Sequence, residues 1–482
     1  MLHSKDINKI WELKNGFTQR WLEPEFILSS LKCFSFSSLC SCISSVKMRG
    51  YSFESVLTIL ISLPFIGAAS VHSMVNGVVK HHIESGKDTF YRLKNNPGIC
   101  WRLILWLFAA KFKRLAETSS SSSQHIRCMV FDDTVIAKTG KLIEKASRVW
   151  NHVSNGYVLG FKLLLMGYWD GISFVPLDFS YHRERGKNKE KPFGLKKKEL
   201  KKQYKKKRTP GTYNYERAEE ADMSKIDIAI KMFKRAISQG FHVDYVLMDS
   251  WFTCGAFINA VLSVKKQPIH LIGMYKIVKT KFTYCGEMYT YSQIRNMLGK
   301  ARRCRKLGYY YKEATVFSGG KELKLFFSKQ GKNGKWKVFI CTDTRLSFIK
   351  MIEIYQTRWS IEVFFKEAKQ LLGLGKCQSN DFDAQIADAT ITMVQHILLT
   401  CKFRYENYES KPGMFARIKE EATLQRLNQR LWGLFLEVVR TVAAIFEDID
   451  REQLFERIMQ DEQVYEKIAR LIGCDQETRK AA

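Results

Sequence analysis

Long uninterrupted apolar runs are missing from this sequence. Its most apolar stretch, Val56–Val71, is interrupted by Pro64 and is shorter than the ~20 residues that a membrane-spanning helix needs. Met1–Asp6 also lack the apolar core of a signal peptide. We therefore expect a soluble protein with no membrane as a partner.

Cysteines in metal-binding or disulfide patterns are missing as well. The 12 cysteines are scattered without a CxxC pair, and a single residue separates Cys40 from Cys42. These spacings indicate neither a zinc finger nor a disulfide framework. We expect reduced thiols and a cytoplasmic location.

Negative charge is scarce in this chain. Asp and Glu number 48 against 78 Lys and Arg, which gives a net charge of +30. Once a membrane is set aside, nucleic acid is the main partner for such an excess. An apolar content of 45% and an aromatic content of 13% indicate a folded protein, and 482 residues predict two to four domains.

Composition distinguishes the two ends of the chain and a linker. Residues 1–117 favour helices and are predicted to form a DNA-binding domain; the alternative is a helical domain that only packs on its neighbour. Residues 118–125 are rich in serine and are predicted as a flexible linker. Residues 405–482 return to helices and are a candidate dimerisation region.

The middle of the chain alternates between strand and helix patterns. The expected order is three strands, a helix, a strand, a helix and a strand: Ile126–Phe131, Tyr157–Tyr168, Ile172–Phe179, Glu216–Gln239, Val243–Met248, Ala256–Val264 and Ile269–Met274. Turn signals then indicate a β-strand insertion at about 275–344. The order predicts an α/β fold with a ribonuclease-H-like catalytic core over residues 126–404, flanked by helical regions.

Three acidic residues fall where such a core would bring them together. Asp132 ends the first strand, Asp249 ends the fourth strand, and Glu362 lies on a helix expected to pack across both. Carboxylates gathered in this way repel one another unless cations neutralise them. Two Mg²⁺ ions about 3.5–4 Å apart would do so and would drive an in-line displacement at phosphorus.

These acids have structural alternatives. Strand alternation turns Asp133 away from Asp132, so we prefer Asp132 as the metal ligand and expect Asp133 to cap a turn. Asp249 alone also suits a helix N-cap. We expect Ser250 and Trp251 to pack behind the site.

The segment Tyr355–Lys369 has no Gly or Pro, so it is predicted to be one continuous helix. At roughly 100° per residue, four of its side chains lie within about 60° of one another: Tyr355, Arg358, Glu362 and Lys369. The phenol and the two cations suit phosphate oxygens, which Arg binds bidentately. The alternative is an ordinary solvated helix face held by ion pairs.

A dense basic run extends from Arg183 to Arg208. Charge runs are usually solvated and mobile. Because this one lies between two predicted catalytic acids, we favour a loop or helix that lies along a DNA backbone.

The same residues support a resemblance to a known family. The spacing Tyr355-(2)-Arg358-(3)-Glu362-(6)-Lys369 matches in full the Tyr-Arg-Glu-Lys signature of the insertion-sequence-four family of bacterial DDE transposases. The chain also resembles that family around its two aspartates and in its β insertion, over roughly residues 126–400. The segments that carry the aspartates are Val130–Thr134 and Val246–Trp251.

This resemblance implies a dimeric, cut-and-paste enzyme that acts on the terminal inverted repeats of its element and on target DNA in the bacterial nucleoid. It implies two Mg²⁺ ions, with Mn²⁺ as a substitute metal. By the resemblance, the metal ligands are Asp132, Asp249 and Glu362, and the phosphate contacts near the DNA end are Tyr355, Arg358 and Lys369.

The resemblance also concerns a base-stacking tryptophan. Members of the family commonly free their ends through a DNA hairpin, with a Trp of the insertion stacked on a flipped base. Val338 stands at that position here, and Trp336 lies two residues earlier on the same strand face. Trp336 is therefore the candidate for base stacking, and the hairpin step depends on it.

Two other functions use the same features. A ribonuclease-H-like nuclease would cleave DNA without joining it, and a transposase-derived DNA-binding protein would no longer be catalytic. The intact acids and basic signature argue against the second of these. Inverted repeats around the coding sequence would favour the transposase.

Overall fold

A computed structural model describes residues 25–43, 51–78, 86–119, 125–265, 267–276 and 280–424, together with residues 460, 461, 463 and 467. The chain divides into two compact units. Unit 1 comprises residues 1–33, 55–89 and 408–482, and unit 2 comprises residues 34–54 and 90–407. The helical region expected at 1–117 thus supplies segments to both units.

Unit 1 is helical in its described part. Phe65 lies at its centre and packs against Phe26 and Phe415, with ring centroids 5.2 and 5.6 Å away. Aromatic rings at these separations contribute beyond the area that they bury. Its elements are α2 (Glu25–Cys33), α4 (Phe53–Ser62), α5 (Val71–Ser73), the π-helix η1 (Met74–Val78) and a helix over 411–424.

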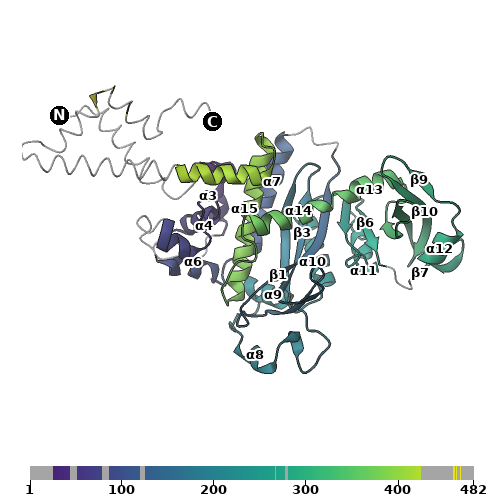
Figure 1. The fold of residues 1–482 in the computed structure, drawn as a ribbon, viewed down its shortest axis with the longest axis horizontal. Helices are drawn as coiled ribbons and strands as arrows, with labels where there is room; N and C mark the ends of the chain where they lie inside the picture. Colours follow the sequence, from purple (N-terminus) through teal and green to yellow (C-terminus); the bar gives the residue numbers. More distant parts are fainter. Residues whose placement is uncertain are drawn as a thin grey trace, which may run out of the picture. The chain divides into compact units, whose positions relative to one another are not determined.

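Unit 2 is built on one mixed sheet of 12 strands (Figure 1). Within this sheet β1, β5 and β6 are parallel neighbours. The order across the sheet is β2-β3-β1-β5-β6-β12-β11-β10-β7-β8, with β4 paired to β3 and β9 paired to β10. The strands are β1 (Cys128–Ala137), β2 (Ser147–Asn151), β3 (Gly156–Trp169), β4 (Phe174–His182), β5 (Tyr245–Met248), β6 (His270–Tyr275), β7 (Lys281–Tyr284), β8 (Glu287–Thr290), β9 (Arg302–Cys304), β10 (Tyr309–Ser318), β11 (Lys321–Gln330) and β12 (Lys337–Cys341).

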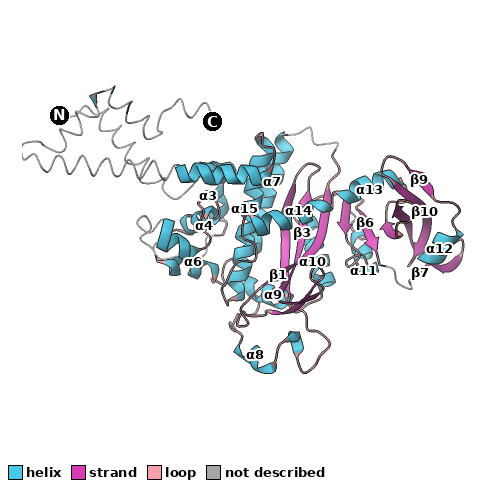
Figure 2. Ribbon diagram, in the orientation of Figure 1, coloured by secondary structure: helices cyan, strands magenta, loops and turns pink. Residues whose placement is uncertain are grey.

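Helices cover both faces of the central strands (Figure 2). Phe131 of β1 packs against Phe257 of α11 on one face, whereas Thr134 contacts Lys369 of α14 on the other. Phe364 of α14 in turn packs against His396 of α15. The helices of this unit are α3 (Phe36–Ser41), α6 (Lys87–Lys94), α7 (Trp101–Ser119), the 3₁₀ turn η3 (Pro192–Gly194), α8 (Lys197–Lys202), α9 (Tyr213–Glu220), α10 (Lys225–Ser238), α11 (Gly255–Leu262), α12 (Tyr291–Met297), α13 (Phe348–Gln356), α14 (Trp359–Gln370) and α15 (Phe382–Tyr405).

The predicted strands and helices of the middle region are present, but some differ in number or bounds from the prediction. Strand β2 was not expected. The helix expected at Glu216–Gln239 is two helices, because the chain turns at Asp222, whose carboxylate bonds Lys145 and Arg183. The serine-rich linker begins later than expected, since α7 continues to Ser119; residues 120–124 lie outside the described residues.

The β insertion is part of the main sheet. It begins after β6 and ends with β12, and these two strands are antiparallel neighbours, with Val338 opposite Tyr275 and Cys341 opposite Ile272. Figure 1 shows β9, β10 and α12 at the end of the unit farthest from α15. The insertion therefore extends the sheet at the edge formed by β6.

None of the described helices combines the length and the apolar character needed to cross a membrane. Most of the expected C-terminal helical region, 405–482, lies outside the described residues. Its part in dimerisation stays a prediction, as does DNA binding by residues 1–117.

Candidate functional site

Asp132 and Asp249 are carried by neighbouring parallel strands. β1 and β5 are paired from Cys128 opposite Tyr245 to Phe131 opposite Met248, and each aspartate is the next residue. Because the two strands run in the same direction, Asp132 and Asp249 both come directly after the paired segment and lie at the same level along the sheet. The structure thus places the strands of these two acids next to each other.

The prediction that Asp132 ends its strand is wrong. β1 continues to Ala137, and the continuation is paired with β3, in which Leu165 lies opposite Asp132. Asp132 therefore lies in the middle of a strand, at the point where β5 no longer covers one edge. The turn that we expected Asp133 to cap does not exist.

Strand alternation separates Asp132 from Asp133. Asp132 faces the junction of α13 and α14, where Arg358 donates to its Oδ2 at 2.8 Å. Asp133 faces α10, where Lys225 donates to it, and it lies 3.6 Å from the buried ammonium of Lys162. Because side chains on a strand point to opposite faces in turn, only one of the two can join Glu362. The preference for Asp132 rests on this geometry.

The segment Tyr355–Lys369 is two helices, not one. α13 ends at Gln356 and α14 begins at Trp359. The hydroxyl of Thr357 donates to the carbonyl of Ile354 at 2.8 Å, a carbonyl that its own N–H also uses. Such side-chain bonds compete with the helix ladder and explain the break. Tyr355 thus lies on α13, whereas Glu362 and Lys369 lie on α14.

Arg358, at the junction of these helices, joins two of the acids. Its guanidinium donates to Asp132 on β1 and also to Glu362, one turn further along α14. The Arg358 and Asp132 side chains are mostly buried, while Glu362 is one-third exposed. One cation therefore neutralises carboxylates that are 230 residues apart in the sequence, from position 132 to position 362.

Tyr355 and Lys369 attach the two helices to the strands that carry the acids. The Tyr355 hydroxyl donates to the carbonyl of Met248 at 3.2 Å, next to Asp249, and burial raises the pKa of this phenol to about 12. The Lys369 ammonium donates to Thr134 Oγ1 at 2.7 Å and to the carbonyl of Val135 at 3.1 Å, and burial lowers its pKa. Both predicted phosphate contacts are occupied by protein groups in this structure.

Asp249 begins a tight turn. Its Oδ1 accepts the N–H groups of Trp251 at 2.9 Å and Phe252 at 3.3 Å, and its carbonyl accepts the Thr253 hydroxyl at 2.7 Å. Gly273 of β6 makes room for this turn, because a Cβ at that position would lie 2.2 Å from Thr253 Oγ1. The helix α11 begins only at Gly255, so Asp249 caps a turn and not a helix.

The electrostatics of the site centre on Asp132. Burial raises its pKa to about 7; Arg358 opposes this rise, and the neighbouring Asp249 adds to it. Asp249 and Asp132 also both act on the Tyr355 phenol. The site thus concentrates negative charge that a single guanidinium neutralises only in part.

The fit of a metal ion can be judged from these donors. Among the described residues, no group of three or more His, Cys, Asp or Glu side chains is arranged to hold a metal ion. The chemistry nevertheless suits a divalent cation, since carboxylate oxygens are its preferred ligands and two of the acids already share a cation. Asp132, Asp249 and Glu362 therefore fit the ion by donor type, with Arg358 between two of them.

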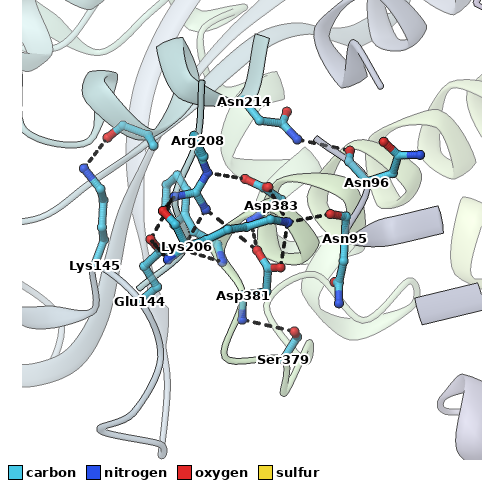
Figure 3. A network of polar contacts seen from close by, with 12 residues as sticks. Asn95, Asn96, Glu144, Lys145, Lys206, Arg208, Asn214, Ser379, Asp381 and Asp383 are labelled. Atoms are coloured by element: carbon cyan, nitrogen blue, oxygen red, sulfur yellow. Dashed lines mark hydrogen bonds and ion pairs between the residues drawn. The ribbon is translucent and has the colours of Figure 1, made fainter. Parts of the chain in front are cut away.

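Part of the basic run is buried, contrary to the prediction that it lies along DNA. Arg208 donates to both oxygens of Glu144 at 2.7–2.8 Å and to Asp383 at 2.8 Å, and Lys206 lies 2.8–2.9 Å from Asp383 and Asp381 (Figure 3). Charges this deep are found where opposite charges compensate them. The exposed members are Arg185, Lys187, Lys189, Lys191, Lys196, Lys197, Lys198, Lys201, Lys202, Lys205 and Lys207.

Tryptophans near the site lie differently from expectation. Trp251 does not pack behind the site, since half of its surface is exposed. Trp336 directly precedes β12, and its ring has Arg295 and Lys329 of the insertion as cationic neighbours. Because β12 pairs with β6, Trp336 lies at the same end of the strands as Asp249, two strands beyond β5. Trp359, on α14 next to Arg358, is 63% exposed and was not singled out from the sequence.

Comparison with known proteins gives one family match. Residues 166–394 match the family model described as Transposase DDE domain. The match begins in β3 and ends in α15, so it includes Asp249, Glu362 and the basic signature but not Asp132. No curated protein matches the sequence significantly. The matched region supports transposase activity in general.

Proposed function

We propose that this protein is a DDE transposase with a ribonuclease-H-like core, which cuts DNA at the ends of its element and joins those ends to target DNA. The observation that carries the proposal is the convergence of distant residues on Asp132. Asp249 follows the parallel strand beside it, and Arg358 links it to Glu362. The match over residues 166–394 supports the same chemistry.

In this proposal Asp132, Asp249 and Glu362 hold Mg²⁺, or Mn²⁺ in its place. Two such ions would supply the activation of the attacking water or 3′-hydroxyl and the stabilisation of the leaving oxygen. The chain's own contribution is to position the acids: β1 and β5 set the aspartates side by side, and Tyr355 and Lys369 fasten α13 and α14 to those strands.

Arg358 is the residue best suited to meet a phosphate. Its guanidinium is already directed at the acids, and such a group binds two phosphate oxygens at once. For Tyr355 and Lys369 the predicted phosphate contact would compete with Met248, Thr134 and Val135. We propose these two residues as supports of the site first and as phosphate contacts second.

DNA is the proposed partner, as terminal inverted repeats and as target. Eleven exposed cations between positions 185 and 207, together with the net charge of +30, supply a surface for phosphates. A homodimer in the DNA complex, formed through residues 405–482, belongs to the same proposal. So does base stacking by Trp336 during a hairpin step.

The test is a gel assay with the purified full chain, the labelled ends of its element, target DNA and Mg²⁺. We expect nicked ends and joined products from the native protein, and neither from Asp132→Ala, Asp249→Ala or Glu362→Ala, which should still bind the ends. Glu219→Ala removes an exposed carboxylate of α9 and serves as the control. Nicks without joined products would indicate the nuclease, and residual cleavage above a few per cent would remove that acid from the site.

A further inference from the structure

The side chain of Trp251 is unusually exposed for a tryptophan next to a predicted catalytic acid. It lies two residues after Asp249, on the turn that this aspartate begins, and it is 50% exposed. Large aromatic side chains normally bury most of their surface, so an exposed one beside acidic residues calls for an explanation.

The backbone below the ring is fixed. The Trp251 N–H donates to Asp249 Oδ1, Phe252 is buried, and Thr253 fills the space above Gly273. The ring is therefore exposed on a turn that is anchored on both sides, and its exposure does not come from a loose segment.

Two ammonium groups from other elements approach the ring. Lys276, directly after β6, places Nζ 4.0 Å from the ring centroid, and Lys225, the first residue of α10, places Nζ at 4.9 Å. Lys225 also bonds Asp133. Cation–π contacts at exposed positions stabilise a fold only slightly, and they do not require half of the ring to face solvent.

An exposed aromatic face with cations around it is the combination that binds unpaired nucleotides. A base stacks on the ring whatever its sequence, and the cations neutralise the adjoining phosphates. Lys276 is exposed and its ammonium is carried on a flexible four-carbon stem, so it can move from the ring to a phosphate when a base arrives, whereas Lys225 stays bonded to Asp133. Trp251 follows Asp249 by two residues and donates its N–H to that carboxylate, so such a nucleotide would lie close to Asp249.

We infer that Trp251, Lys225 and Lys276 form a subsite for one unpaired nucleotide of DNA beside Asp249. The base lies on Trp251, and the phosphate lies on Lys276. The inference rests on the proposed function in taking DNA as the ligand. It adds a contact that the Tyr-Arg-Glu-Lys signature does not contain, at a position in the chain well before the insertion residue Trp336.

A photo-crosslinking experiment tests the inference without catalysis. The probe is a duplex of the element's end with a short single-stranded flap that carries 5-iodouracil, mixed with the full chain in EDTA. We expect the adduct at position 251 in the native protein and also in Trp251→Phe, which keeps an aromatic ring. In Trp251→Leu we expect adduct yield to fall at least ~10-fold, and affinity for the flap probe to fall by about 5- to 100-fold, the range expected when one base no longer stacks.

Tyr157→Leu is the matched control, because Tyr157 is another exposed aromatic, at 63%, on β3 of the same unit. It should leave yield and affinity unchanged. Lys276→Gln should weaken binding of the flap probe and lower the salt slope by about 1. Native affinity in Trp251→Leu, or adducts only at other residues, would overturn the subsite. The crosslinking mixture contains EDTA, so it tests nucleotide binding without cleavage. A protein that does not cleave DNA can still give the adduct at position 251, and a protein without this adduct can still cleave.

Discussion

Arg358 donates to Asp132 at 2.8 Å across 226 residues of sequence. The same guanidinium bonds Glu362, so the positive charge of Arg358 lies between the carboxylates of Asp132 and Glu362. We expect Arg358→Ala to abolish end cleavage and to weaken binding of the cut end, because the variant cannot form a charge-assisted hydrogen bond to phosphate. Arg358→Lys keeps the positive charge but lacks the two parallel N–H donors of a guanidinium. It should therefore retain only part of the cleavage and part of the binding of the cut end. A band-shift and cleavage series with the three proteins checks this; unchanged processing in Arg358→Ala would make the residue structural.

Asp132 and Asp133 should differ in two measured properties, the free energy of unfolding and DNA cleavage. Asp133→Asn leaves the buried Lys162 with its charge uncompensated, so the free energy of unfolding should fall by about 1–3 kcal/mol while cleavage persists. Asp132→Asn should abolish cleavage without lowering stability. Urea melts and the cleavage assay on both variants decide this. Loss of cleavage in Asp133→Asn, at a denaturant concentration where it is folded, would reverse the assignment.

Stability of the metal-free protein should depend on pH through Asp132. Its folded pKa of about 7 lies above the ordinary value, so the folded state binds the extra proton. That contribution is complete below about pH 4 and is lost as the pH rises through 7. We expect Asp132→Asn to gain on the order of 2 kcal/mol relative to the native protein between pH 5 and pH 8. Melts at several pH values in EDTA measure the difference, and a constant offset between the two proteins would contradict it.

Gly273 should matter although it touches no acid. A Cβ there meets Thr253 Oγ1 at 2.2 Å, and Thr253 bonds the backbone of Asp249. We expect Gly273→Ala to lower the free energy of unfolding by about 1–3 kcal/mol through overpacking, and to reduce cleavage at least ~10-fold through displacement of Asp249. A double-mutant cycle with Thr253→Ala, in urea, should show strong coupling. Additive effects would mean that the two side chains do not meet.

The basic run should divide into two functional classes. Arg208→Met leaves Glu144 and Asp383 buried without their partner, so we expect a loss of about 3–5 kcal/mol in stability and no change in the salt dependence of DNA binding. Lys197→Gln, Lys198→Gln and Lys201→Gln together should leave stability unchanged and reduce the salt slope by about 0.9 for each phosphate that the protein no longer neutralises. A flat salt dependence in the native protein would remove DNA from this surface.

The sequence allowed much of the core to be predicted because its signals are local. The apolar runs before Asp132 and Asp249 predicted strands, and both strands are present as neighbours in the sheet. The alternation of side chains along a strand correctly predicted that Asp133 points away from Asp132, because this alternation depends only on the strand period. The spacing of Arg358 and Glu362 predicted a shared stripe, and these two side chains do bond each other.

What the sequence could not predict depends on contacts between distant segments. Nothing local distinguishes Lys206 and Arg208 from the exposed lysines before them; Glu144 and Asp383 make the difference. The break at Thr357 comes from a side-chain bond that competes with the helix. Trp251 follows an apolar strand and was expected to pack behind the site, but half of its surface is exposed. A tryptophan two residues after a strand-end aspartate was the only local signal.

The attachment of the β insertion has a mechanical consequence. The chain enters it from β6 and returns through β12, and these two strands are bonded to each other. Outside the sheet, Tyr311 of β10 stacks on Phe348 of α13, with ring centroids 4.2 Å apart. A force on the insertion would therefore reach the helix that carries Tyr355, whose hydroxyl bonds the carbonyl of Met248.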